Sequence, residues 1–182
     1  MRYRKIFACS DEDLGRTDLV QHTIEIGDGR PIKQHPRRLP MMMREIEQEE
    51  VGRMLKRNVI VPSSSPWASP TVMVKKKDEK IRFCVDYRKL NELTKKDAYP
   101  LPSIDDCIDN LDGEKYFCTM DLQSGYWQVN MDPKDQEKTA FCTQSGLYEF
   151  KFMPFGHTND SESNGFWKGS QDATWLSDWI LQ

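Results

Sequence analysis

The stretch TVMVKKKDEKIRFCVDYR, residues 71–88, decides the fold class of this chain. It begins with an apolar run, and after the charged middle Ile81, Phe83 and Val85 alternate with polar neighbours. Alternation at every second residue is typical of a half-buried strand, so the two runs predict a β-hairpin. The hairpin would carry cations at its tip and flank: Lys75, Lys76, Lys77, Lys80 and Arg82. A charged tip is most often a solvated turn, and a functional role is the alternative.

A second stretch, TMDLQSGYWQVNMD at residues 119–132, places a carboxylate where an apolar run ends. Asp121 closes that run and precedes two aromatic side chains, Tyr126 and Trp127. One interpretation is a strand end that meets solvent. The other is a Mg²⁺ ligand, because hard divalent ions bind carboxylate oxygens and substrate phosphates. One carboxylate cannot hold a pair of ions, so this second interpretation requires further acidic residues.

Polar segments precede the first predicted helix. Residues 1–20 have no clear periodicity and are interpreted as a linker or loosely held arm. Residues 22–26 alternate weakly and predict a short strand. The basic, proline-containing segment 27–40 is either a solvated connector or an extended arm that touches phosphates.

Residues 43–57 predict an amphipathic helix that ends near Asn58. Its apolar face would hold Ile46, Val51, Met54 and Leu55, and its outer face Glu45, Glu47, Gln48 and Glu49. The proline- and serine-rich segment 61–70 predicts a loop, with Trp67 as its hydrophobic anchor.

The C-terminal half predicts one more helix and several strands. Ser103 would cap a helix that Gly113 ends, with Ile104, Cys107, Ile108 and Leu111 on its apolar face. The predicted strands are residues 116–121, 126–131, 138–143 and 147–152. Antiparallel hairpins with packed helices point to an α+β fold. The composition shifts at about residue 157, which is a candidate boundary.

Composition excludes few functions. The 182 residues are 37% hydrophobic and 30% charged, and the net charge of −3 leaves no global basic surface for nucleic acid, although a local patch would suffice. No apolar run approaches the length of a membrane span, so no membrane partner is expected. The five cysteines form no CxxC pair, which favours reduced thiols in an intracellular compartment.

Two long segments together resemble one known family. They are PSSSPWASPTVMVKKKDEKIRFCVDYRKLNELTKKDAYPLPSIDD and YFCTMDLQSGYWQVNMDPKDQEKTAFCTQSGLYEFKFMPFG. Both are similar to the reverse transcriptase of gypsy-type LTR retrotransposon Pol polyproteins. The resemblance implies a right-hand polymerase fold, with the fingers and part of the palm in residues 21–156. Residues 1–20 would be a linker, and residues 157–182 a divergent tail.

The resemblance also implies roles for individual residues. Asp121 matches the first catalytic aspartate, which ligates two Mg²⁺ ions together with the backbone carbonyl of Leu122. Tyr126 matches the aromatic residue under the incoming sugar, where a ring rejects a ribose 2′-hydroxyl. The nucleotide-binding set would be Lys76 or Lys77 on the γ-phosphate, Arg82 on the base and phosphate, Tyr126, and Phe155 beside the nucleotide. Arg88 and Asn91 match positions near the template.

The implied partners follow from the same resemblance. They are an RNA or DNA template with its primer, and deoxynucleoside triphosphates. The parent polyprotein would also carry protease, RNase H and integrase segments. The family is found in cytoplasmic particles with later delivery to the nucleus, so the expected location is intracellular.

The chain departs from the family pattern after Gly156. No Tyr-x-Asp-Asp sequence, which carries the other catalytic carboxylates of the family, occurs in the 182 residues. His157 and Asp160 replace the usual leucine and alanine, so the tail suggests a frameshift, a mis-spliced gene or a decayed copy. The expectation is an RNA-directed DNA polymerase by family that is inactive as this chain alone. The alternatives are a non-catalytic nucleic-acid-binding fragment and a decayed product without function.

Overall fold

The computed structural model describes residues 7–10, 13–75, 79, 81–96, 103–109, 111–113, 115–116 and 122–157. In chain order the strands are β1 (Thr17–His22), β2 (Ile60–Pro62), β3 (Ser69–Lys75), β4 (Ile81–Val85), β5 (Val129–Met131), β6 (Phe141–Cys142) and β7 (Leu147–Phe150). The helices are α1 (Met41–Lys56), α2 (Arg88–Leu93) and α3 (Ile104–Asp109), with 3-10 turns η2 (Gly125–Gln128) and η3 (Gln136–Thr139). The predicted α+β class is confirmed.

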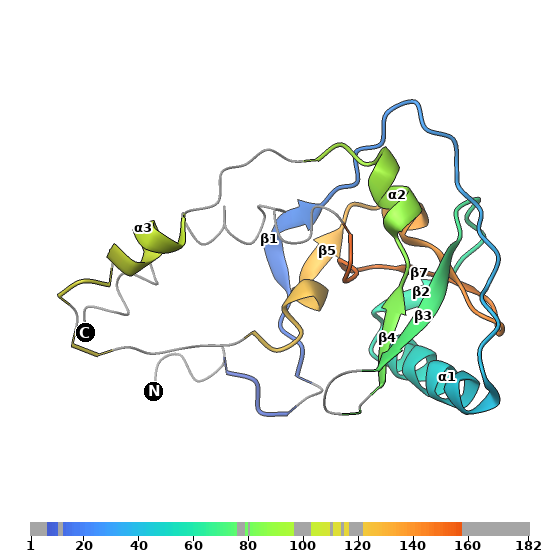
Figure 1. The fold of residues 1–182 in the computed structure, drawn as a ribbon, viewed down its shortest axis with the longest axis horizontal. Coiled ribbons are helices and arrows are strands. Elements are labelled where there is room, and N and C mark those ends of the chain that lie inside the picture. The colour runs from blue at the N-terminus through green and yellow to red at the C-terminus, as the bar shows by residue number, and fades with distance from the viewer. Residues whose placement is uncertain are drawn as a thin grey trace.

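A five-stranded sheet in the order β2-β7-β6-β3-β4 forms the larger part of the fold. β3 and β4 pair antiparallel, with Val74 opposite Arg82 and Thr71 opposite Val85. This confirms the hairpin predicted from residues 71–88. β6 and β7 form a second hairpin, and β6 joins the first one through parallel pairing with β3. Figure 1 shows this sheet with α1 at one end and α2 at the other.

A second sheet pairs the N-terminal segment with the centre of the chain. β1 and β5 run parallel, with Gln21 opposite Asn130 and His22 opposite Met131, and they lie side by side in Figure 1. The prediction of a linker over residues 1–20 is therefore wrong from Thr17 onward. The strand predicted at residues 22–26 lies earlier in the chain. Its register is set by a distant partner, which weak local alternation does not reveal.

Helix α1 begins two residues before its prediction and carries a buried acid. Val51 and Met54 are buried as expected, whereas Leu55 stays exposed. Glu47, predicted on the outer face, is only 2% exposed and accepts a hydrogen bond from the Thr71 hydroxyl of β3. That bond compensates the burial of a charged group, which is why a polar residue occupies the apolar face. The helix ends as predicted, since Asn58 takes the left-handed conformation with φ 54°.

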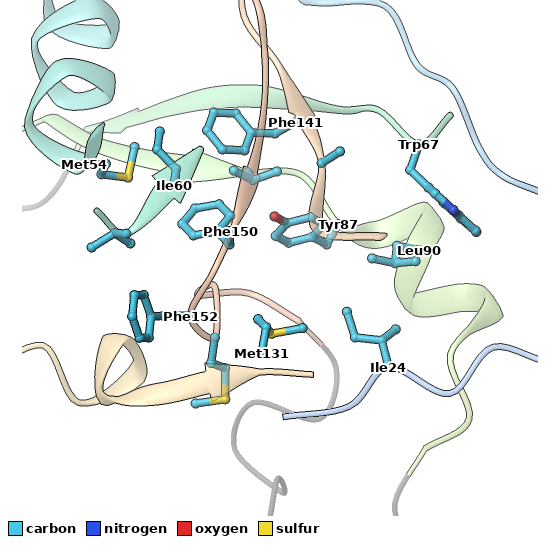
Figure 2. Packing of buried hydrophobic residues seen from close by; sticks show 14 of the residues in the cluster. Ile24, Met54, Ile60, Trp67, Tyr87, Leu90, Met131, Phe141, Phe150 and Phe152 are labelled. Carbon is cyan, nitrogen blue, oxygen red and sulfur yellow. The ribbon is translucent and has the colours of Figure 1, made fainter. Parts of the chain in front are cut away.

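The core lies between the two sheets and the helices (Figure 2). Phe141 is fully buried and packs against the rings of Phe83, Tyr148 and Phe150. Trp67 is 4% exposed, which confirms it as the anchor of its loop. The core continues under the small sheet through Ile24, Val129 and Met131, so the two sheets share one core.

Several predicted elements differ in length or lie outside the described residues. The strand predicted at 126–131 is a 3-10 turn followed by β5, and the one at 138–143 shortens to β6 after η3. Side-chain hydrogen bonds within 135–139 favour turns there, such as the Thr139 hydroxyl to the Gln136 carbonyl. Ile108 and Leu111, predicted on an apolar face, are exposed. Most of the strand predicted at 116–121 and nearly all of the tail 157–182 lie outside the described residues.

Helix α2 has no sequence prediction, because its six residues are too few to show a clear period. Within the described residues, no helix combines the length and apolar character that a bilayer span requires. The described cysteines Cys9, Cys84 and Cys142 are free thiols.

Candidate nucleotide-binding site

Arg82 and Phe155 meet beside the β3–β4 hairpin. The alternation of β4 turns Phe83 inward onto Phe141, with ring centroids 5.7 Å apart, and leaves Arg82 on the opposite, exposed face. The Arg82 guanidinium carbon lies 3.9 Å from the centroid of the Phe155 ring. This distance is that of a cation–π contact, which restrains the position of the exposed guanidinium.

Tyr126 contacts the same ring, that of Phe155, from another segment of the chain. Its ring and that of Phe155 form an edge-to-face pair, with centroids 5.4 Å apart and planes at 85°. Tyr126 lies in the turn η2, which follows Ser124 in a left-handed conformation with φ 50°. Gly125 fits there because a Cβ would lie 3.2 Å from the Cβ of Leu122. The stretch SGY thus permits the tight turn that directs Tyr126 toward Phe155.

The structure therefore brings together three of the predicted nucleotide-binding residues. Arg82, Tyr126 and Phe155 come from three separate elements and form one exposed cluster, in which Phe155 is 45% exposed. Leu122, predicted to supply a carbonyl ligand, is also exposed near the start of this turn. Asp121, Lys76 and Lys77 lie outside the described residues. At the hairpin tip Lys75 forms an ion pair with Glu79 at 2.9 Å.

The predicted template residues lie on and around α2. Arg88 donates two hydrogen bonds to Asp86, from Nε to Oδ1 at 2.8 Å and from Nη2 to Oδ2 at 2.7 Å. These bonds, the largest influence, lower the pKa of Asp86 and raise that of Arg88. Asn91 instead donates from Nδ2 to the carbonyl of Gly156 at 3.1 Å. Its described contact is thus with the turn that carries Phe155.

Two arginines near these residues were not singled out from the sequence. Arg37, within the basic segment 27–40, also binds the Asp86 carboxylate. Arg16 lies over the ring of Phe152 at 3.5 Å and donates to the carbonyl of Trp127, next to Tyr126. No local sequence signal could reveal the contacts of Arg16, because Phe152 and Trp127 lie more than a hundred residues away.

Two buried histidines, His22 at the end of β1 and His157 after the turn that carries Phe155, lie next to each other. His22 and His157 are each 4% exposed and pack edge to face, with ring centroids 5.4 Å apart. Burial lowers the pKa of His22 to about 4, although the nearby Asp135 carboxylate raises it in part. Burial, followed by the charge of His22, lowers the pKa of His157 to about 3. Both rings are therefore neutral at neutral pH.

Within the described part of the chain, no group of three or more His, Cys, Asp or Glu side chains could hold a metal ion. The predicted ligand Asp121 is not among those residues. What the described cluster provides is a cation, two aromatic rings and an exposed surface between them. Such a surface can bind a phosphate and stack on a planar base.

Comparison with known proteins defines the class to which this arrangement belongs. The family model described as reverse transcriptase (RNA-dependent DNA polymerase) matches residues 74–160. Its range includes the hairpin flank, Tyr126 and the turn that carries Phe155. The chain therefore belongs to the reverse transcriptase family.

Several of its relatives are Pol polyproteins of transposons. The chain is 40% identical over 169 residues to the Retrovirus-related Pol polyprotein from transposon gypsy of Drosophila melanogaster, covering 88% of this chain and 16% of the relative. It is also 40% identical over 166 residues to the polyprotein from transposon 297 of the same organism, covering 87% of this chain and 15% of the relative. The chain thus spans only a small part of these polyproteins.

A solved structure confirms the fold. The crystal structure of Prototype Foamy Virus Protease-Reverse Transcriptase matches with a TM-score of 0.75 at 25% identity, over 87% of this chain and 21% of that one. The foamy viral enzyme in complex with an RNA/DNA hybrid matches with the same TM-score at 23% identity, over 85% of this chain and 21% of that one. The predicted reverse transcriptase-like architecture is confirmed.

Proposed function

We propose that this chain forms the fingers and part of the palm of an RNA-directed DNA polymerase and binds the incoming deoxynucleoside triphosphate. The observation that carries the proposal is the convergence of Arg82, Phe155 and Tyr126 on one exposed surface. These residues are far apart in the sequence, and the fold brings the exposed Arg82 and Phe155 to Tyr126, which is itself partly buried against the core.

Each residue of the cluster has a chemical task in this proposal. Arg82 is a fixed cation that neutralises charge on the triphosphate and lies against the base. Tyr126 supplies the floor under the sugar and excludes a ribose 2′-hydroxyl by its bulk, and Phe155 holds both side chains in place. Lys76 or Lys77 would extend the positive charge toward the γ-phosphate.

Magnesium fits the donor chemistry of the neighbouring segment. Asp121 and the Leu122 carbonyl offer the oxygen ligands that Mg²⁺ prefers, and bound Mg²⁺ would stabilise the oxygens of an in-line phosphoryl transfer. The 182 residues contain no Tyr-x-Asp-Asp sequence. We therefore propose that the chain binds nucleotide but does not extend a primer by itself.

The test measures nucleotide binding and primer extension separately. We expect dTTP with Mg²⁺ to bind the chain on a primer–template whose next template base is adenine, and binding to weaken in Arg82→Ala. Arg53→Ala is the matched control, because Arg53 is an exposed arginine on α1, outside both the cluster and the basic segment 27–40. Absence of dTTP binding by the unchanged chain would refute the proposal. Extension abolished by Asp121→Asn would show that this chain is active and refute the second part.

A second candidate function is nucleic-acid binding without catalysis. Arg37 and Arg88 share the single carboxylate of Asp86, which leaves excess positive charge on the exposed surface between the basic segment 27–40 and α2. This arrangement favours contact with phosphates of a template. Binding of a primer–template that weakens steeply with salt, in a chain that does not bind dTTP, would support this function instead.

Two further proposals concern the domain boundary and the parent polyprotein. We propose that the boundary near residue 157 separates the polymerase segment from a divergent tail, within an intracellular polyprotein that also carries protease, RNase H and integrase. Sequencing the transcript beyond the codon for Gly156 tests the boundary, since an alternative frame that encodes Tyr-x-Asp-Asp would restore the missing carboxylates. A non-cooperative unfolding transition would instead favour a decayed product.

A further inference from the structure

The turn that carries Phe155 lies between two buried residues, Pro154 and His157, but it leaves the Phe155 ring exposed. Phe155 is 45% exposed, so burial cannot fix the direction of its ring. The following residue, Gly156, has φ +97°, a conformation that side-chain-bearing residues rarely adopt. A glycine at this position makes the turn possible but also adds conformational freedom. Contacts from outside the turn can therefore help to hold the ring against Arg82 and Tyr126.

Helix α2 reaches this turn through side chains. Asn91 donates from Nδ2 to the Gly156 carbonyl at 3.1 Å. One turn further on, the Thr94 hydroxyl lies 3.3 Å from Nε2 of His157. Two neighbouring residues of the turn are therefore held from the same short segment, residues 91–94.

α2 is a rigid support for these contacts. Leu90 is 2% exposed and belongs to the core cluster. The backbone N–H of Asn91 donates to the Tyr87 carbonyl at 2.7 Å. The Tyr87 hydroxyl donates to the Thr139 carbonyl at 2.7 Å. The start of the helix is thus fastened to η3 on one side, while the Asn91 side chain extends to the Gly156 carbonyl.

We propose that Asn91 is a positioning residue for the nucleotide site: its amide fixes the Gly156 carbonyl and thereby holds the Phe155 ring against Arg82 and Tyr126. This inference deepens the proposed function and rests on it. It assigns Asn91 a task different from template contact. Asn91 acts on the incoming deoxynucleoside triphosphate through Phe155 and does not need to touch it.

The first test examines the position of the ring without any nucleotide. In the unchanged chain the Phe155 ring should shift the NMR signal of the Arg82 Nε–H group, because the guanidinium lies over the ring. Phe155→Ala defines the signal without the ring. We expect Asn91→Ala to move the signal most of the way to that value. A signal unchanged in Asn91→Ala would overturn the proposal.

The second test is a double-mutant cycle on dTTP affinity, measured with Mg²⁺ and a primer–template. Loss of one hydrogen bond should weaken dTTP binding about three- to tenfold in Asn91→Ala. If Asn91 acts through Phe155, the same substitution should have no further effect in a Phe155→Ala chain. An equal loss in both backgrounds would mean direct contact and overturn the proposal.

The controls separate positioning from stability and from template contact. Alanine is a better helix former than asparagine, so a weaker helix cannot explain a loss in Asn91→Ala. Glu92→Gln changes the exposed neighbour on α2 and should leave the Arg82 signal and dTTP affinity unchanged. A lower primer–template affinity with unchanged dTTP affinity would assign Asn91 to the template and overturn the proposal. If the unchanged chain does not bind dTTP, the proposed function fails, and the Arg82 signal still decides the position of the ring.

Discussion

The β3–β4 hairpin and the β1–β5 pair are built in opposite ways. The hairpin joins strands that are adjacent in the chain and pair antiparallel over five residue pairs. The β1–β5 pair joins strands about 113 residues apart, where Asn130 donates to the Thr17 carbonyl, and it is parallel and irregular. The hairpin carries Arg82, whereas β1 supports the turn that carries Tyr126. The proposed nucleotide site thus depends on one locally determined element and one that forms only with the whole fold.

The β3–β4 hairpin and the β1–β5 pair share one core, and Phe141→Ala tests whether they depend on it together. Phe141 is fully buried and packs on Phe83 of the hairpin and Phe150 of β7. We expect the free energy of unfolding in urea to fall by about 3–5 kcal/mol, as for other buried phenylalanines. Amide exchange should accelerate in both the hairpin and β1, because the core continues beneath both.

The control for this substitution is Val74→Ala in β3, at a side chain that is 45% exposed. It removes apolar atoms from the hairpin without opening a cavity. A loss in Phe141→Ala no larger than in this control, or faster exchange in the hairpin alone, would show that the two regions fold independently.

Acid should destabilise the β1–β5 pair before it destabilises the hairpin. Burial lowers the pKa of His22 to about 4 and that of His157 to about 3, whereas a histidine in an unfolded chain has a pKa near 6.5. Between about pH 6.5 and pH 4 the unfolded chain therefore binds protons that the folded chain excludes. Stability is complete above this range and should fall by about 1.4 kcal/mol per pH unit for each histidine as pH decreases.

The measurement is the urea midpoint at a series of pH values, with amide exchange in β1 and β4. Because His22 ends β1, exchange should accelerate there before it does in the hairpin. His22→Phe should remove about half of the pH dependence, because His157 remains, and His35→Gln, at the exposed third histidine, should leave it unchanged. A dependence equally steep in His22→Phe would assign it to other groups.

The same contrast explains what the sequence could predict. Alternation in Ile81–Val85 defines the hairpin locally, and resemblance to the family selected Arg82, Tyr126 and Phe155, which the fold brings together. Strand β1 could not be predicted, because its partner lies in the other half of the chain. The bond from Asn91 to Gly156 was missed for the same reason, since tertiary contacts leave no local period.

Arg16 offers a way to weaken the distant pair alone. Its guanidinium lies over Phe152 and donates to the Trp127 carbonyl, which fastens the start of β1 to the end of η2. Arg16→Ala should cost about 1–2 kcal/mol, the sum of a cation–π contact and one hydrogen bond. Amide exchange should accelerate in β1 and β5 and stay unchanged in β4. Arg38→Ala, at another exposed arginine, is the control, and an equal effect there would point to net charge as the cause.

A substitution at the hairpin tip should give the smallest change in stability, and glycine should be the stabilising choice there. Glu79 has φ 64°, in the left-handed region that costs a residue with a side chain about 1 kcal/mol. It also forms an ion pair with Lys75, but both side chains are largely exposed, so screening leaves that pair little weight. Glu79→Gly should therefore be more stable than Glu79→Ala by about 1 kcal/mol, because both variants lose the ion pair and only glycine relieves the strain. The urea midpoints of the two variants measure this difference. Since the tip is a local element, exchange in β1 should be the same in both, and a change there would mean that the hairpin and the distant pair are coupled more tightly than their shared core requires.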